Sequence, residues 1–185
     1  MQHTATSGRA LPLANVLPVT ASINEAGRLA LGGCDTVELV GEYGSPLYVF
    51  DEATLRGQCR AFVEEFRRLY PQTDVRYAAK AYLGRALAAI INAEGLGLDV
   101  VSGGELAIAL SVGFPAAAID FHGNNKSEQE LREAVGAGIG HVVVDNFHEL
   151  ALLDRVARGL GRRQPVLLRL SPGVDPHTHL SLIHI

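Results

Sequence analysis

The sequence is poor in several residue types, and each shortage argues against a class of protein. It contains two cysteines, Cys34 and Cys59, whose spacing fits no metal-binding pattern, so neither a disulfide framework nor a zinc site is indicated. No apolar stretch approaches the roughly 18 residues that a membrane-spanning helix needs. Met1 to Ala10 lack the basic and apolar segments of a secretory leader. These shortages favour a cytoplasmic protein without a membrane partner.

Basic residues do not gather into runs. The 16 lysines and arginines are scattered along the chain, and the net charge is -4. A nucleic-acid partner is therefore not indicated. Of the 185 residues, 48% are hydrophobic and 19% are charged, a composition that favours a folded protein with a buried core.

The N-terminal part of the chain has little periodicity until its first long helix. Residues 1–30 mix small and polar residues with short apolar pieces, so we expect a loose arm there. Pro46 to Phe50 predicts a strand. Asp51 is placed to cap the next helix, which should end before Pro71. The apolar positions of this helix, which we expect to be buried, are Leu55, Cys59, Phe62, Val63, Phe66 and Leu69.

Beyond Pro71 a unit of one strand and one helix repeats. Short apolar runs begin near Val75, Gly97, Ile119, His141 and Val166. Helical patterns follow the first four runs, at Gly84 to Glu94, Gly104 to Val112, Glu128 to Ala137 and Phe147 to Leu160. Ser127 and Glu130 form a predicted capping box at the start of one helix, and Gly138 stands where that helix should end. The pattern predicts βα alternation.

The alternation indicates a parallel sheet covered by helices, because Val142 to Val144 and Val166 to Leu168 are apolar on both faces. A doubly wound fold would place a glycine-rich phosphate turn after an early strand, but Lys80 to Gly84 is not such a turn. We therefore predict an α/β fold that is a partial (β/α)8 TIM barrel with about five of eight strands, since a complete barrel takes about 250 residues. The incomplete barrel should span residues 46–180.

Polar residues after the predicted strands are the candidates for chemistry, because the active sites of such barrels lie at the carboxyl ends of the strands. Lys80 follows the first strand, among Tyr77, Ala78, Ala79 and Ala81. Partial desolvation there would lower the pKa of Lys80 and favour Schiff-base formation. Alternatively, Lys80 is a lysine that snorkels at a strand edge.

Other candidates have both a functional and a structural interpretation. Asp99 could balance a positive charge or end a strand in a turn. The turn from Ser102 to Glu105 could bind an anion or only begin a helix. The run His122 to Lys126 could line a site or form an ordinary polar loop. His177 and His179 lie on one side of an extended segment, but no third ligand is obvious, so we predict no metal.

Four motifs are recognisable in their order along the chain. They are Tyr77-Ala-Ala-Lys80-Ala81, Leu98-Asp99-Val-Val-Ser-Gly-Gly-Glu105-Leu106, Phe121-His-Gly-Asn-Asn-Lys-Ser127 and Pro172-Gly-Val-Asp175. They resemble the motifs of diaminopimelate decarboxylases, which belong to the alanine-racemase-like, fold type III group of pyridoxal-phosphate-dependent decarboxylases. The resemblance spans roughly residues 30–180.

The resemblance implies a cofactor, a reaction and a set of site residues. Lys80 would hold pyridoxal 5'-phosphate as a Schiff base, and Asp99, Glu105, His122 and Arg169 would contact the cofactor. The implied reaction is the decarboxylation of meso-2,6-diaminopimelate to L-lysine and carbon dioxide, the last step of lysine biosynthesis.

The family pattern also includes parts that this sequence does not contain. These are further barrel strands, a glycine-rich phosphate cradle and a C-terminal β-domain, which residues 1–45 would join in a homodimer. The catalytic cysteine of the family comes from that domain of the partner subunit, so Cys34 and Cys59 are not given that role. Residues 181–185 depart from the pattern and are expected to be a non-native tail. We therefore expect the chain by itself to be inactive.

Three other functions fit the same residues. One is another pyridoxal-phosphate amino-acid decarboxylase of the same fold group. The second is a barrel aldolase that uses Lys80 in a Schiff base without pyridoxal phosphate. The third is a non-catalytic relative that only binds the cofactor.

Overall fold

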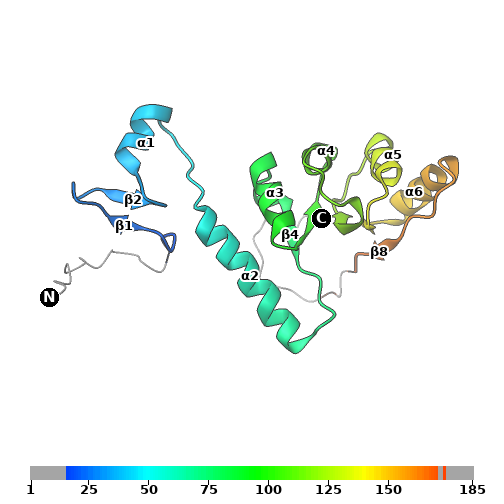
Figure 1. Cartoon of the computed structure of the whole chain (residues 1–185). Helices are drawn as coiled ribbons and strands as arrows, with labels where there is room; N and C mark the ends of the chain where they lie inside the picture. Colours follow the sequence, from blue (N-terminus) through cyan, green and yellow to red (C-terminus); the bar gives the residue numbers. More distant parts are fainter. Residues whose placement is uncertain (1–15, 171–172, 174–185) are drawn as a thin grey trace. The chain divides into compact units, whose positions relative to one another are not determined.

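The structure of the chain is a computed structural model that describes residues 16–170 and Gly173. The chain divides into two compact units, residues 1–73 and residues 74–185. Figure 1 shows short strands and the helices α1 and α2 in the first unit, and alternating strands and helices in the second. The predictions for His177 and His179, for the tail at residues 181–185 and for the first half of the arm lie outside the described residues.

The first unit contains a small antiparallel sheet in the order β1-β2-β3. Its strands are Ser22–Ile23 (β1), Leu29–Leu31 (β2) and Cys34–Asp35 (β3), and helix α1 follows at Thr36–Tyr43. Asp35 caps α1 by accepting a hydrogen bond from the N–H group of Val37 at 2.7 Å. The prediction of a loose arm was therefore wrong from Ser22 onward. Strands of two and three residues are too short to leave a period in the sequence.

The segment that precedes the long helix is not a strand. Residues 45–50 contain no regular structure, so the prediction of a strand from Pro46 to Phe50 was wrong. Proline has no N–H group to donate, and no described strand pairs with this segment. Helix α2 spans Glu52–Leu69 and begins as predicted, because Asp51 accepts a hydrogen bond from the N–H group of Thr54 at 2.8 Å.

The apolar stripe of α2 is only partly buried. Cys59 is buried, as predicted, whereas Phe62, Phe66 and Leu69 are 56%, 50% and 63% exposed. The prediction of burial was therefore wrong for these three residues. A helix of 18 residues is about 27 Å long, and the short strands β1 to β3 offer far less apolar surface than that length would need.

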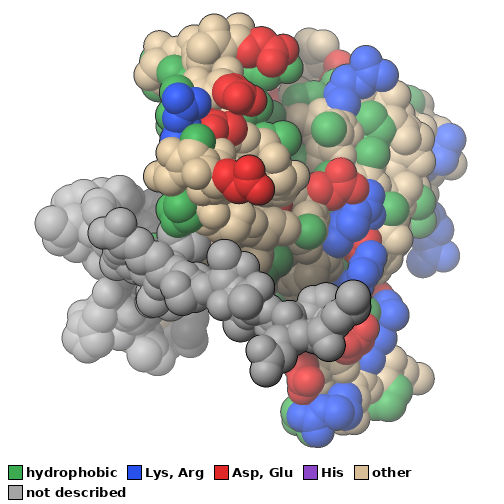
Figure 2. Space-filling model, turned by 60° about the vertical axis from the view of Figure 1, so that its left-hand side comes forward, with side chains coloured by type: hydrophobic (Ala, Val, Ile, Leu, Met, Phe, Trp, Pro, Cys, Tyr) green, Lys and Arg blue, Asp and Glu red, His purple; other side chains and the backbone are tan. Residues whose placement is uncertain are grey.

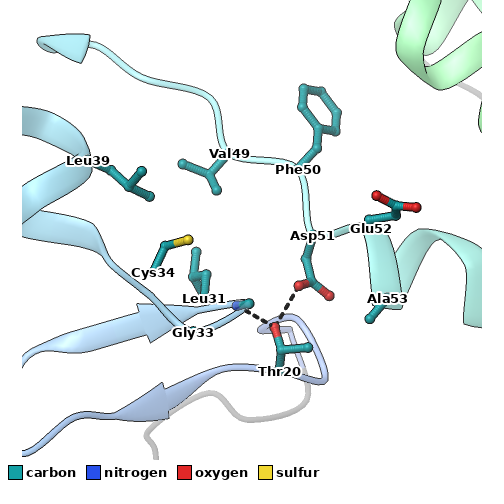
Figure 3. A pocket seen from close by; sticks show the side chains of 11 residues that line it. Thr20, Leu31, Gly33, Cys34, Leu39, Val49, Phe50, Asp51, Glu52 and Ala53 are labelled. Atoms are coloured by element: carbon teal, nitrogen blue, oxygen red, sulfur yellow. Dashed lines mark hydrogen bonds between the residues drawn. The ribbon is translucent and has the colours of Figure 1, made fainter. Parts of the chain in front are cut away.

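A hollow of about 600 Å3 lies in the first unit. Its lining includes the apolar side chains of Leu31, Leu39, Val49 and Phe50. Figure 3 shows Thr20 at its edge, where the hydroxyl group donates to Asp51 Oδ1 at 2.6 Å and accepts from the N–H group of Gly32 at 2.8 Å. These bonds tie the start of α2 to the small sheet. The hollow contains none of the predicted site residues.

The second unit is the predicted alternation of strands and helices (Figure 1). Its strands are Arg76–Ala78 (β4), Gly97–Val100 (β5), Ile119–Phe121 (β6), His141–Val144 (β7) and Val166–Leu168 (β8). Its α-helices are Arg85–Ala93 (α3), Gly103–Ser111 (α4), Glu128–Ala137 (α5) and Phe147–Gly159 (α6), and short 3-10 helices lie at Ala79–Ala81 (η1) and Ala116–Ala118 (η2). The predicted strands and helices are confirmed to within about two residues at each end.

The five strands of this unit form one parallel sheet in the order β4-β5-β6-β7-β8. Each strand pairs with the next strand of the sequence, and a helix connects each pair. This sequential order is the one that a (β/α)8 barrel requires, and it differs from the reversed order of a doubly wound sheet. The prediction of a partial TIM barrel with five of the eight strands is confirmed.

The core of the unit lies between the sheet and its helices. Leu98, Val100, Ile119 and Phe121 are fully buried, as are Leu106 and Leu131 of the helices that cover them. The last strand is different, because Val166, Leu167 and Leu168 are 38%, 47% and 63% exposed. The apolar sequence of Val166 to Leu168 fits the parallel sheet, but these residues are not buried in the described part of the chain, since β8 stands at the end of the strand order and has one neighbour.

The start of α5 joins two loops at the carboxyl ends of the strands. Ser127 and Glu130 form the predicted capping box, and Gly138 ends the helix in the left-handed conformation at φ 74°. Glu130 also accepts a hydrogen bond from the N–H group of Gly103 at 2.8 Å. The N–H groups of Gly103 and Ser127 hold the pKa of Glu130 below its usual value. One carboxylate thus fixes the loops before α4 and α5.

We expect replacement of Glu130 by glutamine to weaken both loops at neutral pH. Glutamine has one acceptor oxygen, so the bonds from Ser127 or from Gly103 are lost, at a cost of about 1 kcal/mol. Since the pKa of Glu130 is lowered in the folded state, the carboxylate stabilises above its unfolded pKa, and that contribution disappears as the pH falls through the folded pKa. The difference between the two proteins should therefore shrink below about pH 4.3.

Amide hydrogen exchange of peptides that contain Gly103 and Ser127 measures this effect. It is best recorded in the full-length product of the gene that contains this sequence, called the complete gene product below. Asp154→Asn, which removes an acidic side chain from an exposed pair on α6, is the control and should leave the exchange rates unchanged. A loss of protection in Glu130→Gln that is equally large at pH 7 and at pH 4 would contradict the assignment.

Candidate functional site

The candidate site lies where the strands of the parallel sheet end. Lys80 is in η1, directly after β4, and Asp99 is the third residue of β5. His122 directly follows β6, and its N–H group donates to the carbonyl of Val100 at 2.7 Å. Glu105 lies in the first turn of α4. Four elements in succession therefore present polar groups at one end of the sheet.

Asp99 is the centre of this group. Its carboxylate interacts electrostatically with Lys80, His122, Glu105 and Asp120. Its Oδ1 atom is buried and has no hydrogen-bond partner among the described residues. Burial raises the pKa of Asp99 above its ordinary value. Asp120 and Glu105 act in the same direction, whereas His122 and Lys80 oppose the rise. A buried acceptor without a partner is unusual and indicates a place where a donor binds.

Of the two lysines in the sequence, Lys80 is the one whose amine is accessible to solvent. The sequence contains two lysines, Lys80 and Lys126. Lys126 is buried and its amine is fully engaged, whereas Lys80 is exposed at the strand end. The prediction that Lys80 is partly desolvated was therefore wrong for the described residues, because the surrounding strand ends leave its side chain open to solvent. The count of lysines is a signal that sequence reasoning overlooked.

Glu105 fixes the loop that follows β5. Its Oε2 atom accepts a hydrogen bond from the N–H group of Val101 at 2.7 Å, and Ser102 caps α4 by accepting from the N–H group of Glu105 at 3.2 Å. The N–H group of Gly103 is bound to Glu130. Three backbone donors of this turn already have partners, which favours the structural interpretation of the turn over an anion site.

The polar run after β6 contains a buried ion pair. Lys126 Nζ lies 2.8 Å from Glu149 Oε1, and these side chains are 1% and 5% exposed. The same amine donates to the carbonyls of Gly123 and Val143, at 2.6 and 2.9 Å, and lies 5.8 Å from the centre of the Phe121 ring. Lys126 therefore fastens the loop that begins at His122 to β7 and α6.

Arg169 lies apart from the Asp99 group. It directly follows β8 and forms an ion pair with Asp145 at 2.9 Å, with 47% of its side chain exposed. A hollow of about 310 Å3 between the ends of β7 and β8 is lined by both residues and by Phe147, Leu150 and Leu170 among others. The structure therefore places four of the five predicted site residues together and the fifth at the next pair of strand ends.

Three polar residues on the strands around Asp99 were not predicted from the sequence. Arg76 of β4 and His141 of β7 both contact Asp120 of β6, at 3.0 and 2.9 Å. The available signal was an aspartate in the middle of an apolar strand, because Asp120 lies between Ile119 and Phe121 just as Asp99 lies between Leu98 and Val100. An acidic residue at such a position needs a partner.

The second unit is part of a (β/α)8 barrel with a lysine, Lys80, at the end of its first strand. The family model described as the pyridoxal binding domain of pyridoxal-dependent decarboxylases matches residues 53–182. The chain belongs to this family. Among curated relatives, a diaminopimelate decarboxylase from Bacillus methanolicus is 49% identical over 160 residues, which cover 86% of this chain and 37% of the relative. The chain thus spans little more than a third of that relative's length.

Solved structures give the same result. A diaminopimelate decarboxylase from M. jannaschii in complex with L-lysine has a TM-score of 0.79 at 36% identity, covering 88% of this chain and 38% of that one. A lysine/ornithine decarboxylase from Vibrio vulnificus in complex with putrescine has a TM-score of 0.63 at 27% identity, covering 76% of this chain and 37% of that one. Both likenesses support the fold of the second unit as part of a decarboxylase barrel.

The described residues fit a carbonyl cofactor of this kind. Lys80 provides an exposed amine at the end of β4, and Asp99 provides an acceptor that lacks a donor beside it.

Within residues 16–170, each helix is too short or too polar to traverse a lipid bilayer. No set of three or more His, Cys, Asp or Glu side chains in the same part of the chain is arranged to hold a metal ion. Figure 2 shows acidic and basic side chains interspersed on the face that it displays.

We expect the loss of either partner of the buried Lys126–Glu149 pair to destabilise the protein strongly. Replacing one partner leaves a buried charge without compensation, so Lys126→Met or Glu149→Gln should lower the free energy of unfolding by about 3–5 kcal/mol. The double variant Lys126→Met with Glu149→Leu should recover most of that loss, because no buried charge remains.

Denaturant unfolding of the complete gene product measures the change. Glu128→Gln, which breaks the exposed pair with Arg132, is the matched control and should cost less than about 1 kcal/mol. Single variants at Lys126 and Glu149 that are as stable as this control would show that the buried pair does not hold the loop.

Proposed function

We propose that the complete gene product is a pyridoxal-phosphate-dependent diaminopimelate decarboxylase, which converts meso-2,6-diaminopimelate to L-lysine and carbon dioxide. The observation that carries the proposal is the position of Lys80, the available lysine amine, at the end of the first barrel strand beside Asp99. Family membership supports the cofactor, and the names of the relatives support the reaction.

Lys80 would hold the cofactor and release it to the substrate. When bound, pyridoxal phosphate supplies a carbonyl carbon that condenses with an amine and a ring that accepts the electron pair left by departing carbon dioxide. Lys80 Nζ at a strand end is accessible to such a carbonyl and to an incoming amino group. Its exposure also leaves it free to exchange protons with solvent once the substrate has displaced it.

Asp99, Glu105, His122 and Arg169 would complete the cofactor-binding residues. Asp99 faces Lys80 with a carboxylate that has an open acceptor position, which suits a protonated amine or a ring hydroxyl group. Glu105 and His122 would act beside Asp99, Glu105 by holding the loop after β5 in place. Arg169 carries a positive charge at the end of β8, where it suits a carboxylate or a phosphate group.

The remaining parts of the active site would come from outside this chain. In the proposed arrangement residues 46–180 form part of the barrel, residues 1–45 join a C-terminal β-domain, and two subunits form composite sites in a cytoplasmic homodimer. The share of about a third that the chain covers in its relatives supports this division. The chain by itself would then bind the substrate too weakly to turn it over.

A second candidate is decarboxylation of another basic amino acid. The likeness to a lysine/ornithine decarboxylase favours it, at lower identity and lower TM-score than the likeness to a diaminopimelate decarboxylase. Both candidates require Lys80 in the same role. They differ in the end of the substrate that does not react. This end is an amino acid group in diaminopimelate and a simple amine in lysine or ornithine.

We expect Lys80→Ala to abolish activity in the complete gene product. Loss of the amine should lower kcat by about three orders of magnitude or more. Borohydride reduction of the wild-type protein with pyridoxal phosphate should leave the cofactor's mass on the peptide that contains Lys80, and peptide mass spectrometry detects it. Lys80→Arg keeps the charge without a nucleophilic amine and should be equally inactive.

Carbon dioxide release from meso-diaminopimelate, lysine and ornithine separates the two candidates. Activity on meso-diaminopimelate alone supports the proposal, and activity on lysine or ornithine in its place supports the second candidate. Cofactor recovered on Lys126, or undiminished activity in Lys80→Arg, would overturn the role of Lys80.

A further inference from the structure

A polar bridge of Arg76, Asp120 and His141 lies on the same face of the sheet as Asp99, centred on the neighbouring strand β6. Leu98, Val100, Ile119 and Phe121 are buried against the helices, and successive residues of a strand point to opposite faces. Asp99 of β5 and Asp120 of β6 therefore share the face away from the helices. The two residues are direct partners in the parallel register, so two carboxylates stand side by side.

The two carboxylates differ in their partners. Asp120 accepts from Arg76 Nε through Oδ2 at 3.0 Å and lies 2.9 Å from His141 Nδ1 through Oδ1, so both of its oxygens are engaged. Asp99 has an oxygen without a partner. Like charges on neighbouring strands repel each other. The repulsion is reduced here because the guanidinium group of Arg76 balances Asp120.

Arg76 reaches Asp120 by crossing the strand between them. Arg76 is on β4 and Asp120 on β6, and Gly97 of β5 is the register partner of Arg76. A Cβ atom at Gly97 would lie 2.2 Å from Arg76 Nη1, 2.5 Å from its Cδ and 2.6 Å from the carbonyl of Ala118. Any other residue at this position would block the path of Arg76. The sequence thus provides both the charged side chain of Arg76 and, at Gly97, the space that this side chain occupies.

We propose that Arg76, Asp120 and His141 form a positioning bridge whose function is to set the charge of Asp99 and, through it, the state of the Lys80 amine. This inference rests on the proposed function only in the role of Lys80. Arg76 neutralises Asp120, the register partner of Asp99, which favours ionisation of Asp99 opposite Lys80. The bridge does not touch the reacting groups and acts through Asp99.

The groups that face Asp99 define what the bridge must balance. They are Lys80 from η1, Asp120 and His122 from β6 and its following loop, and Glu105 from α4. Removing Arg76 leaves the charge of Asp120 uncompensated and should raise the pKa of Asp99. Removing Asp120 leaves Arg76 uncompensated and should lower the pKa of Asp99. A bridge that only stabilised the fold would not move this pKa in opposite directions.

The experiment measures the pKa of Asp99 in Arg76→Met, Asp120→Asn and the double variant of the complete gene product. Carboxyl carbon NMR provides the titration, with Asp99→Asn to assign the signal. We expect shifts of about one pH unit in opposite directions for the single variants, and a return toward the wild-type value in the double variant. Arg158→Met and Asp154→Asn change the same charges in an exposed pair and should leave the pKa of Asp99 unchanged.

Arg76→Lys provides a second measurement if Arg76→Met does not fold. Lysine keeps the positive charge, so the pKa of Asp99 should stay close to the wild-type value. Unchanged titration of Asp99 in both single variants, or shifts of the same sign, would overturn the inference. Equal disturbance by the exposed controls would overturn it as well.

The cofactor is followed separately in the same proteins. The pH profile of the visible absorbance of the cofactor bound to Lys80 should move with the pKa of Asp99 in each variant. Opposite shifts at Asp99 in a protein that binds no pyridoxal phosphate would support the bridge and contradict the proposed function. Normal cofactor binding together with a pKa of Asp99 that is the same in all variants would support the proposed function and contradict the bridge.

Discussion

The register of β5 on β6 is the constraint on which the site depends. It places Leu98 opposite Ile119 and Val100 opposite Phe121 on the face covered by helices. Their burial fixes the register, because a slip by one residue would turn the two apolar residues of the slipped strand to the other face. The same register forces Asp99 and Asp120 side by side on the other face. The apolar core and the close pair of carboxylates are thus two results of one strand pairing.

The loops at the strand ends are held by side chains that bind backbone groups. Glu130 joins the loops before α4 and α5, Glu105 holds the N–H group of Val101, and Lys126 ties the His122 loop to β7 and α6. Each of these contacts satisfies a backbone group that the end of a strand or the start of a helix leaves without a partner. Among the described residues, Glu130 and Glu105 thus serve as loop anchors, whereas Asp99 Oδ1 is a buried acceptor without a hydrogen-bond partner at the strand ends.

The sequence was informative where a pattern extends over many residues. Repeated apolar runs and helical spacing were enough to predict β4 to β8, their order and the capping box of Ser127 and Glu130. It was uninformative for β1 to β3, whose strands are two or three residues long, and for Pro46 to Phe50, where local β preference met no partner strand. The grouping of Lys80, Asp99, Glu105 and His122 follows from strand order alone. The bridge of Arg76 to Asp120 does not, because it depends on a glycine in the intervening strand.

The unequal surroundings of the two lysines make this part of the protein unusually simple for amine-directed reagents. Apart from the α-amino group of Met1, the sequence has no other primary amine, and Lys126 is enclosed by Glu149 and two carbonyl oxygens. A lysine-reactive probe applied to the folded chain therefore modifies a single side chain. Occupancy of Lys80 can be read as the loss of that modification, without any knowledge of the substrate.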